Sequence, residues 1–319
     1  MRNRIVCAAA AIACAAATAH AQQYPVKPIR VIVAFAPGGG SDFVARLIGQ
    51  KLGEALGQQV IVDNRPGGGA SLGFDMGMRA APDGYTLTQI TPSYTINPSV
   101  RSIKYDALAD YTPIVMEGKG PLAVLAHPSL PAKNARELIA LAKGKPGQVI
   151  FGTAGQGTIV HLATELFLHQ AGVKMMHVPY KGGAPALVDL MAGEIQLVWS
   201  PPQTGMPYAR AGKLRVLGMT SAKRTRADPD VPTIAESGLP GYEATNWHAL
   251  IAPKGLPRAI QDRLNGEVRK IVNAPEMEKT LLANGIEPEG GTPEALAEHI
   301  RKDLMQWRAV IVRANIRVD

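Results

Sequence analysis

The stretch that decides the fold is Ile29-Arg30-Val31-Ile32-Val33-Ala34-Phe35-Ala36-Pro37-Gly38-Gly39-Gly40-Ser41-Asp42. A β-branched run typical of a buried strand passes into three glycines, and apolar residues then recur at helical spacing over 43–56. Because glycine has no Cβ, the turn can adopt positive φ and a ligand can approach its main-chain N–H groups closely. These groups are unpaired donors at the positive end of a helix dipole. The stretch predicts an anion site with Ser41 or Asp42 as helix N-cap, and its candidate ligand-binding residues are Phe35, Gly38, Gly39, Gly40, Ser41 and Asp42.

Length and composition indicate a folded protein with two lobes. The chain has 319 residues, which exceeds the usual size of a single hydrophobic core. A hydrophobic content of 46% and a charged content of 19% allow substantial cores and argue against extensive disorder. The formal charge is +8, but the densest basic cluster, 223–226, has no interleaved aromatic residues. We interpret that cluster as a solvated loop and expect no nucleic-acid partner.

The first residues resemble an export signal. Two arginines precede the apolar, alanine-rich run 5–17, which is too short to span a bilayer, and Ala19-His20-Ala21 matches an A-x-A cleavage site. We expect residues 1–21 to be removed by cleavage after Ala21, which leaves a soluble exported protein. Both cysteines, Cys7 and Cys14, lie in the removed segment, so no disulfide is expected. A lipid anchor on Cys14 is a weaker alternative, because residues 11–13 match a lipobox poorly.

The first lobe is predicted to contain a parallel sheet. The opening unit is followed by a strand, a helix and a second strand. Strand-forming residues lie at 59–63 and 85–90, and a helical segment lies between them at 72–80. In open α/β sheets, ligands collect at the carboxyl ends of the strands. The glycine turn and the polar segment 91–95 both fall at such ends.

The arrangement of strand, glycine loop and helix appears a second time in the sequence. The short strand 149–151 leads into the glycine loop 152–158, and an amphipathic helix spans 159–171. Because the two copies are far apart in sequence, we place one on each lobe, with the helix N-termini facing each other across a cleft. A ligand with two negative ends could bridge them.

The chain is expected to cross between the lobes twice. The extended run 122–126 is the expected crossing into the second lobe, and the return is expected near 246–253. Two helices, at 257–273 and 293–313, then pack back onto the first lobe. The first lobe is accordingly 22–123 with 248–319, and the second is 124–247.

The sequence lacks the common enzyme signatures. Neither glycine loop completes G-x-G-x-x-G, since Phe43 and Val160 occupy the final glycine positions, and there is no Walker lysine and no G-x-S-x-G. His161 with Glu165 does not make a metal site. We expect no catalysis, no cofactor and no metal. Ser41 and His161 could still be pictured as nucleophile and base, so a secreted small-ester hydrolase stays as an alternative.

Seven short motifs extend over nearly the whole mature chain. They are YPVKPIR at 24–30, PGGGSD at 37–42, DNRPG at 63–67, APDGYTL at 81–87, VPYKG at 178–182, DVPTIAESG at 230–238 and APKG at 252–255. Jointly these motifs resemble the Bug family of periplasmic solute-binding proteins. Members of that family are the extracytoplasmic receptors of tripartite tricarboxylate transporters.

The resemblance implies a two-lobe periplasmic binding protein that closes on its ligand like a flytrap, each lobe a mostly parallel sheet flanked by helices. It also implies that main-chain groups of both glycine loops hold carboxylates. We expect a monomer that delivers its ligand to membrane permease subunits. Carried over residue by residue, the site adds the polar wall at 91–94 and the second loop, namely Thr91, Ser93, Gly155, Gln156, Gly157, Thr158 and His161.

One departure from the family pattern bears on ligand choice. Where the family commonly has acidic residues, this chain has Gln196-Leu197-Val198-Trp199-Ser200-Pro201-Pro202. An acidic group there could pair with a ligand ammonium, whereas Trp199, beside Ser200, offers a flat apolar face. We therefore expect mono- or dicarboxylates, aromatic ones among them, rather than amino acids.

Other interpretations stay open at this point. Each of His161, Trp199 and Trp247 could be an ordinary core residue. The same binding fold could also belong to a sensor subunit that signals to a membrane kinase.

Overall fold

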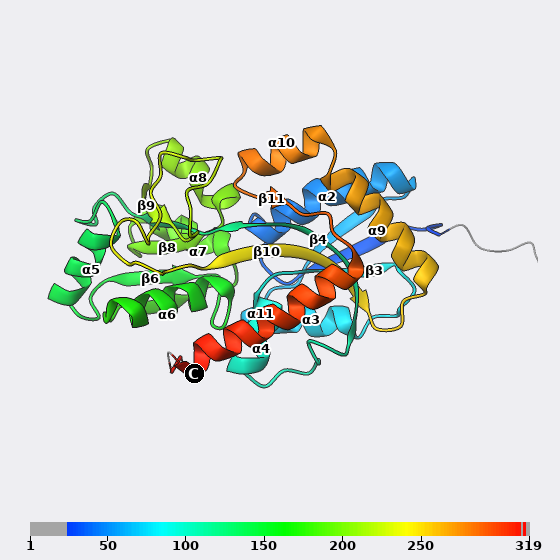
Figure 1. Cartoon of the computed structure of the whole chain (residues 1–319), viewed down its shortest axis with the longest axis horizontal. Helices are drawn as coiled ribbons and strands as arrows, with labels where there is room; N and C mark the ends of the chain where they lie inside the picture. The colour runs from blue at the N-terminus through cyan, green and yellow to red at the C-terminus, as the bar shows by residue number, and fades with distance from the viewer. Residues whose placement is uncertain (1–23, 314, 317–319) are drawn as a thin grey trace, which may run out of the picture.

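The computed structural model describes residues 24–313, 315 and 316 and shows two α/β lobes beside each other (Figure 1). The export signal and its cleavage site lie outside the described residues. Two long strands, β4 (Tyr111–Pro121) and β10 (Thr245–Pro253), lie antiparallel along the middle of the molecule, β4 running toward the second lobe and β10 away from it.

The first lobe is built on a six-stranded sheet in the order β11-β4-β10-β3-β1-β2. Besides β4 and β10, its strands are β1 (Ile29–Val33), β2 (Val60–Asn64), β3 (Thr86–Ile90) and β11 (Glu287–Pro288). Its helices are α2 (Gly40–Leu56), η1 (Gly68–Ala70), α3 (Ser71–Met78), α4 (Ser93–Val100), α9 (Arg258–Val272), α10 (Pro275–Ala283) and α11 (Pro293–Arg313).

The second lobe is built on a five-stranded sheet in the order β7-β6-β8-β5-β9. Its strands are β5 (Ala123–Ala126), β6 (Ile150–Thr153), β7 (Met176–Pro179), β8 (Leu197–Ser200) and β9 (Arg215–Met219). Its helices are α5 (Ala135–Gly144), α6 (Ile159–Ala171), α7 (Gly183–Ala192) and α8 (Pro202–Arg210).

The expectation of mostly parallel sheets is wrong in detail, because both sheets are mixed. Strand β1 pairs in parallel with β2 and β3, but β10 is antiparallel to β3 and β4, and β11 is antiparallel to β4. In the second lobe β6 is parallel to β7 and β8, whereas β5 is antiparallel to β8 and β9. The reason is the double crossing: β4 leaves the first lobe and β10 returns to it beside β4, so these neighbours run in opposite directions.

The crossing points follow from the strand ends. Strand β4 ends at Pro121 and β5 begins at Ala123, so the chain changes sheet at Leu122. The expected return at residue 248 falls inside β10, all of which belongs to the six-stranded sheet. Helix α11 packs on α4 and β4, and its end at Trp307 and Ile311 joins a core cluster shared with the second lobe.

Three helices were not expected from periodicity. Helix α4 contains Pro98, α8 begins at Pro202, and α10 begins at Pro275. Proline fits the first turn of a helix, where its missing N–H leaves no intrahelical bond unmade. For that reason the prolines at 202 and 275 start helices, although a sequence pattern with proline favours a break.

Candidate functional site

A cavity of about 40 Å³ lies between the lobes. It is lined from both sides, by the N-terminus of α2 from the first lobe and by the N-terminus of α6 from the second. Seven of the predicted residues line it: Phe35, Gly39, Gly40, Ser41, Thr91, Thr158 and Trp199. The other lining residues, which the sequence analysis did not select, are Ala154, Ile159, Val160, Gly183, Val198, Pro201, Thr204, Asn246 and His248.

The first glycine loop leaves its main-chain donors free. Within the described part of the chain, the N–H groups of Gly39, Gly40 and Ser41 make no hydrogen bond, and the first amide bonded back into the turn is that of Phe43, to Gly39 O at 3.0 Å. The predicted N-cap is wrong: Gly39 is the N-cap, without a side-chain bond. Because these amides stand at the positive end of α2, they can bind a carboxylate.

Asp42 turns away from the cavity and holds the loop instead. Its carboxylate accepts a hydrogen bond from the Gly38 N–H at 3.0 Å and forms an ion pair with Arg46 at 2.9 Å. Burial favours a raised pKa for Asp42, but the bonds from Arg46 and Gly38 outweigh it and lower the pKa below its usual value. Asp42 and Gly38 therefore line an outer surface hollow rather than the cavity.

The second glycine loop uses most of its donors internally. The Gly155 N–H donates to Thr153 Oγ1 at 3.2 Å, and the Gly157 N–H donates to His161 Nδ1 at 3.1 Å. The Ile159 N–H donates to Ser93 Oγ at 3.2 Å, across the boundary between the lobes. Five of the predicted residues therefore lie behind the lining of the cavity and do not line it themselves, namely Ser93, Gly155, Gln156, Gly157 and His161.

His161 is held as a core residue. Its side chain is 3% exposed, stacks on His177 with ring centroids 4.2 Å apart, and lies 3.5 Å from Glu165. Burial, together with the neighbouring His161, lowers the pKa of His177 to about 3. No hydrogen bond joins Ser41 to His161 in the described chain, so the structure offers no nucleophile and base pair there.

Trp199 and Ser200 occupy the end of β8. Trp199 is 1% exposed and its indole N–H donates to the Tyr242 hydroxyl at 3.2 Å, so this side chain belongs to the second-lobe core and also lines the cavity. Ser200 is buried beside the cavity and donates to Pro201 O at 3.2 Å.

Direct contacts hold the two lobes together around the cavity. The Ala36 N–H donates to Lys181 O at 3.2 Å. Arg101, at the end of α4, donates to Gly68 O at 2.7 Å and also to Gln156 O in the second glycine loop. A Cβ added at Gly40 would lie 2.8 Å from Gln203 Nε2 and 3.0 Å from Pro201 Cβ. The lobes are therefore closed in this structure, and α2 packs on α8 without room for a side chain at residue 40.

Asn246 and His248 are the most informative residues that the sequence analysis missed. They alternate with Trp247 along β10, so both point to the same face of the strand, and both line the cavity. Burial lowers the pKa of His248 to about 4, which keeps the imidazole neutral near pH 7. Two polar residues at alternate positions, followed by the apolar run 249–253, were the available signal.

None of the described residues that line the cavity has a charged side chain. A ligand anion would therefore be held by main-chain dipoles, and a ligand cation would find no carboxylate. Among the described residues there is also no group of three or more histidine, cysteine or acidic side chains that could hold a metal ion.

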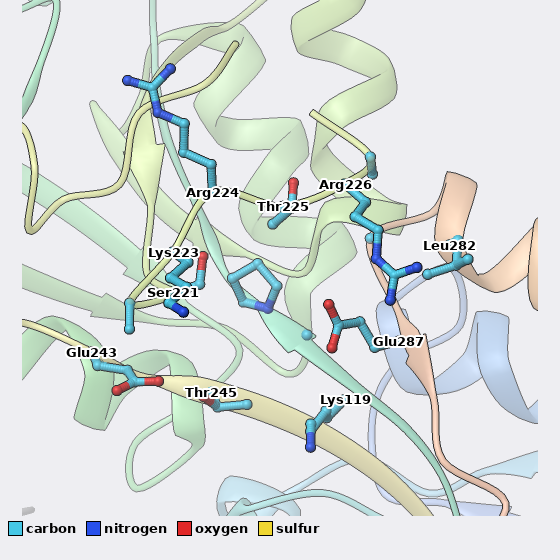
Figure 2. Close-up of a pocket in the computed structure, with 15 residues that line it drawn as sticks. Lys119, Ser221, Lys223, Arg224, Thr225, Arg226, Glu243, Thr245, Leu282 and Glu287 are labelled. Carbon is cyan, nitrogen blue, oxygen red and sulfur yellow. The ribbon is translucent and has the colours of Figure 1, made fainter. Parts of the chain in front are cut away.

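A larger hollow of about 320 Å³ lies elsewhere, between the loop 221–227, the strands β4 and β10, and the turn after α10 (Figure 2). The basic cluster 223–226 lines it together with Glu243 and Glu287, so its charges are mixed. Arg224 is paired with Glu236, and Lys119 with Glu289. Since it contains neither a helix N-terminus nor any predicted site residue, we assign the ligand site to the smaller cavity.

None of the helices in the described part of the chain is both long and apolar enough to span a membrane.

Known proteins resemble this chain over most of its length. Residues 44–316 match the sequence family described as tripartite tricarboxylate transporter family receptor. Protein BugT of Bordetella pertussis is 36% identical over 299 residues, which cover 93% of this chain and 92% of BugT. A solved structure of R. palustris Rpa4515 with adipate is 34% identical, with a TM-score of 0.90 over 92% of this chain and 99% of that one. MatC from Rhodopseudomonas palustris with bound malate is 29% identical, with a TM-score of 0.85 over 90% of this chain and 100% of that one.

Proposed function

Because this chain belongs to the tripartite tricarboxylate transporter receptor family, we propose that it captures a small carboxylate in the periplasm and delivers it to membrane permease subunits. Members of this family are solute-binding receptors and not enzymes, so the expectation of no catalysis is confirmed. The export signal in the sequence supports a periplasmic location, and we propose that the receptor acts as a monomer.

The observation that carries the proposal is the row of free amides at the N-terminus of α2, which faces a cavity between two closed lobes. A hydrogen bond to a charged group contributes about 1.5–3 kcal/mol. A few such bonds reach the roughly 8 kcal/mol of a micromolar complex after the cost of association. Closure would exclude water and strengthen these bonds.

The lining of the cavity supports a carboxylate without an amino group. No acidic side chain lines it that could pair with an ammonium, and Trp199 presents an apolar face. The adipate and malate in the structures of the relatives favour the same class. The proposed ligands are therefore mono- or dicarboxylates, aromatic ones among them.

A thermal-shift screen of carboxylic acids tests the proposal. The panel should contain adipate, malate, citrate, benzoate and, as a contrast, aspartate and glutamate. An acid present at 100 times its dissociation constant stabilises the folded protein by about 2.7 kcal/mol, which gives a measurable rise in Tm. A response confined to amino acids, or turnover of small esters that is lost in Ser41→Ala, would overturn the proposal.

A further inference from the structure

A polar cluster stands beside the first glycine loop. Asn246 and His248 project from β10, and Gln203 and Thr204 from the first turn of α8. The exposed fractions of Asn246, His248 and Gln203 are 4%, 2% and 8%. Three neutral polar side chains are thus more than nine-tenths buried at one place.

The cluster is only partly satisfied by its own hydrogen bonds. His248 Nε2 lies 3.1 Å from Asn246 Nδ2 and 3.4 Å from Gln203 Nε2. Among the residues that the structure describes, four buried atoms of the cluster have no partner, namely Asn246 Oδ1, His248 Nδ1, Gln203 Oε1 and Thr204 Oγ1. A buried polar group without a partner destabilises the folded protein, so a ligand that bonds to these atoms would recover that loss.

The cluster lies close to the free amides. Gln203 Nε2 is 2.8 Å from the position that a Cβ on Gly40 would take, and Asn246, His248 and Thr204 line the same cavity as Gly40. One small molecule in the cavity could therefore contact the amides together with Asn246, His248 and Thr204, whereas Gln203 lines the outer hollow and contacts the cluster from that side.

We propose that this cluster is a hydroxyl subsite, so that the receptor prefers carboxylates that also carry a hydroxyl group. The inference rests on the proposed function, because it assigns the carboxylate to the amides of the first loop.

The donors and acceptors of the cluster fit a hydroxyl better than a second carboxylate. If His248 Nε2 accepts from the two amide groups, Nδ1–H is a free donor and both amide oxygens are free acceptors. If both amides are turned over, their NH₂ groups are free donors and Nδ1 is a free acceptor. Either arrangement presents a donor and an acceptor together, which a hydroxyl satisfies. A carboxylate only accepts, and no cation lines the cavity to balance it.

Matched acid pairs test the inference by isothermal titration calorimetry on the mature protein. The pairs are lactate with propionate, 3-hydroxybutyrate with butyrate, and 4-hydroxybenzoate with benzoate. They differ in the distance between carboxylate and hydroxyl. We expect at least one hydroxy acid to bind more than tenfold more tightly than its partner, because a site built for a hydroxyl leaves buried groups unpaired with the analogue that lacks it.

Two variants separate a ligand role from a structural one. Asn246→Leu and His248→Phe remove the polar atoms at similar volume, and Thr245→Val on the opposite face of β10 is the control. The hydroxy preference is the dissociation constant of the plain acid divided by that of its hydroxy partner. We expect this ratio to fall to about one in both variants and to stay as high as in the unaltered protein in Thr245→Val. The free Asn246→Leu protein should keep or raise its Tm, since it loses an unsatisfied group.

Equal affinity for both members of every pair in the unaltered protein would overturn the inference. It would mean that water molecules satisfy the polar atoms of the cluster as well as a ligand hydroxyl does. A preference that persists in Asn246→Leu and His248→Phe would overturn it too. If no acid binds, with or without a hydroxyl, the proposed function fails together with this inference. Binding of propionate, butyrate or benzoate without a hydroxy preference leaves the proposed function standing.

Discussion

The two glycine loops look alike in sequence and differ in what their amides do. Each has a glycine whose N–H bonds to a side chain four residues on, Gly38 to Asp42 and Gly157 to His161. Each is followed by a helix, at Gly40 and at Ile159. The Gly40 amide is free, whereas the Ile159 amide is bonded to Ser93 of the other lobe. The first loop therefore has free donors for the proposed ligand, whereas the second bonds to the first lobe.

The largest effect on ligand affinity is expected when a side chain is added to the first glycine loop. Gly40→Ala places a Cβ 2.8 Å from Gln203 Nε2 and 3.0 Å from Pro201 Cβ, so the closed state must shift. Overpacking of this kind costs about 1–3 kcal/mol, which corresponds to binding that is weaker by roughly fivefold to 150-fold. Calorimetry with the best acid of the screen measures it, and Gly266→Ala, where a Cβ meets no neighbour within 4 Å, is the control. Unchanged affinity would show that closure on α8 is not needed.

The second largest effect on affinity is expected when Arg101, which bonds to the second glycine loop, is removed. Arg101→Ala removes the side chain that joins Gln156 of the second lobe to Gly68 of the first. We expect about tenfold weaker binding of the same acid, because the lost bond to Gln156 joins the two lobes and so stabilises only the closed state, whereas the lost bond to Gly68 lies within the first lobe. Arg79→Ala, which removes an ion pair within α3, is the control and should change affinity less than twofold. An equal loss in both variants would contradict the role given to Arg101.

A smaller effect is expected when the Ile159 amide is released. Ser93→Ala leaves this N–H without its acceptor in the closed state, at a cost of about 1 kcal/mol, so binding should weaken about fivefold. Ser237→Ala, whose hydroxyl bonds within the second lobe, should leave affinity unchanged. Tighter binding by Ser93→Ala would instead mean that the ligand takes the freed amide and that the two loops are equivalent.

The smallest effect on affinity is expected at Asp42. Asp42→Asn keeps an oxygen for the Gly38 N–H but removes the charge that pairs with Arg46, so folding should weaken by about 1 kcal/mol at pH 7. The pKa of Asp42 is lowered in the folded protein, so its contribution is full above the unfolded pKa and is lost as pH falls through the folded pKa. Urea denaturation at pH 7 and pH 3 should show the difference between the proteins shrinking at the lower pH. Affinity should change less than twofold, and a tenfold gain would place Asp42 against the ligand.

Local patterns in the sequence predicted most elements because they depend on near neighbours. Glycine turns, helical spacing and β-branched runs located β1, α2, α6 and α11. Periodicity missed α8, since its opening prolines favour a break, and with it the position of Gln203 and Thr204. The direction of β4 and β10 was also missed, because strand pairing depends on how the lobes connect and not on any one segment.

The sequence by itself determined the two glycine loops, their helices and the family, since each depends on residues within a short span or on motifs in order. Only the tertiary structure decided which amides are free, because the acceptor for Ile159 lies 66 residues away. It also brought Asn246 and His248 beside Gly40. Hydrogen-bond satisfaction is a property of the packed chain, so two similar glycine loops differ in which amides stay free, according to what the fold places against them.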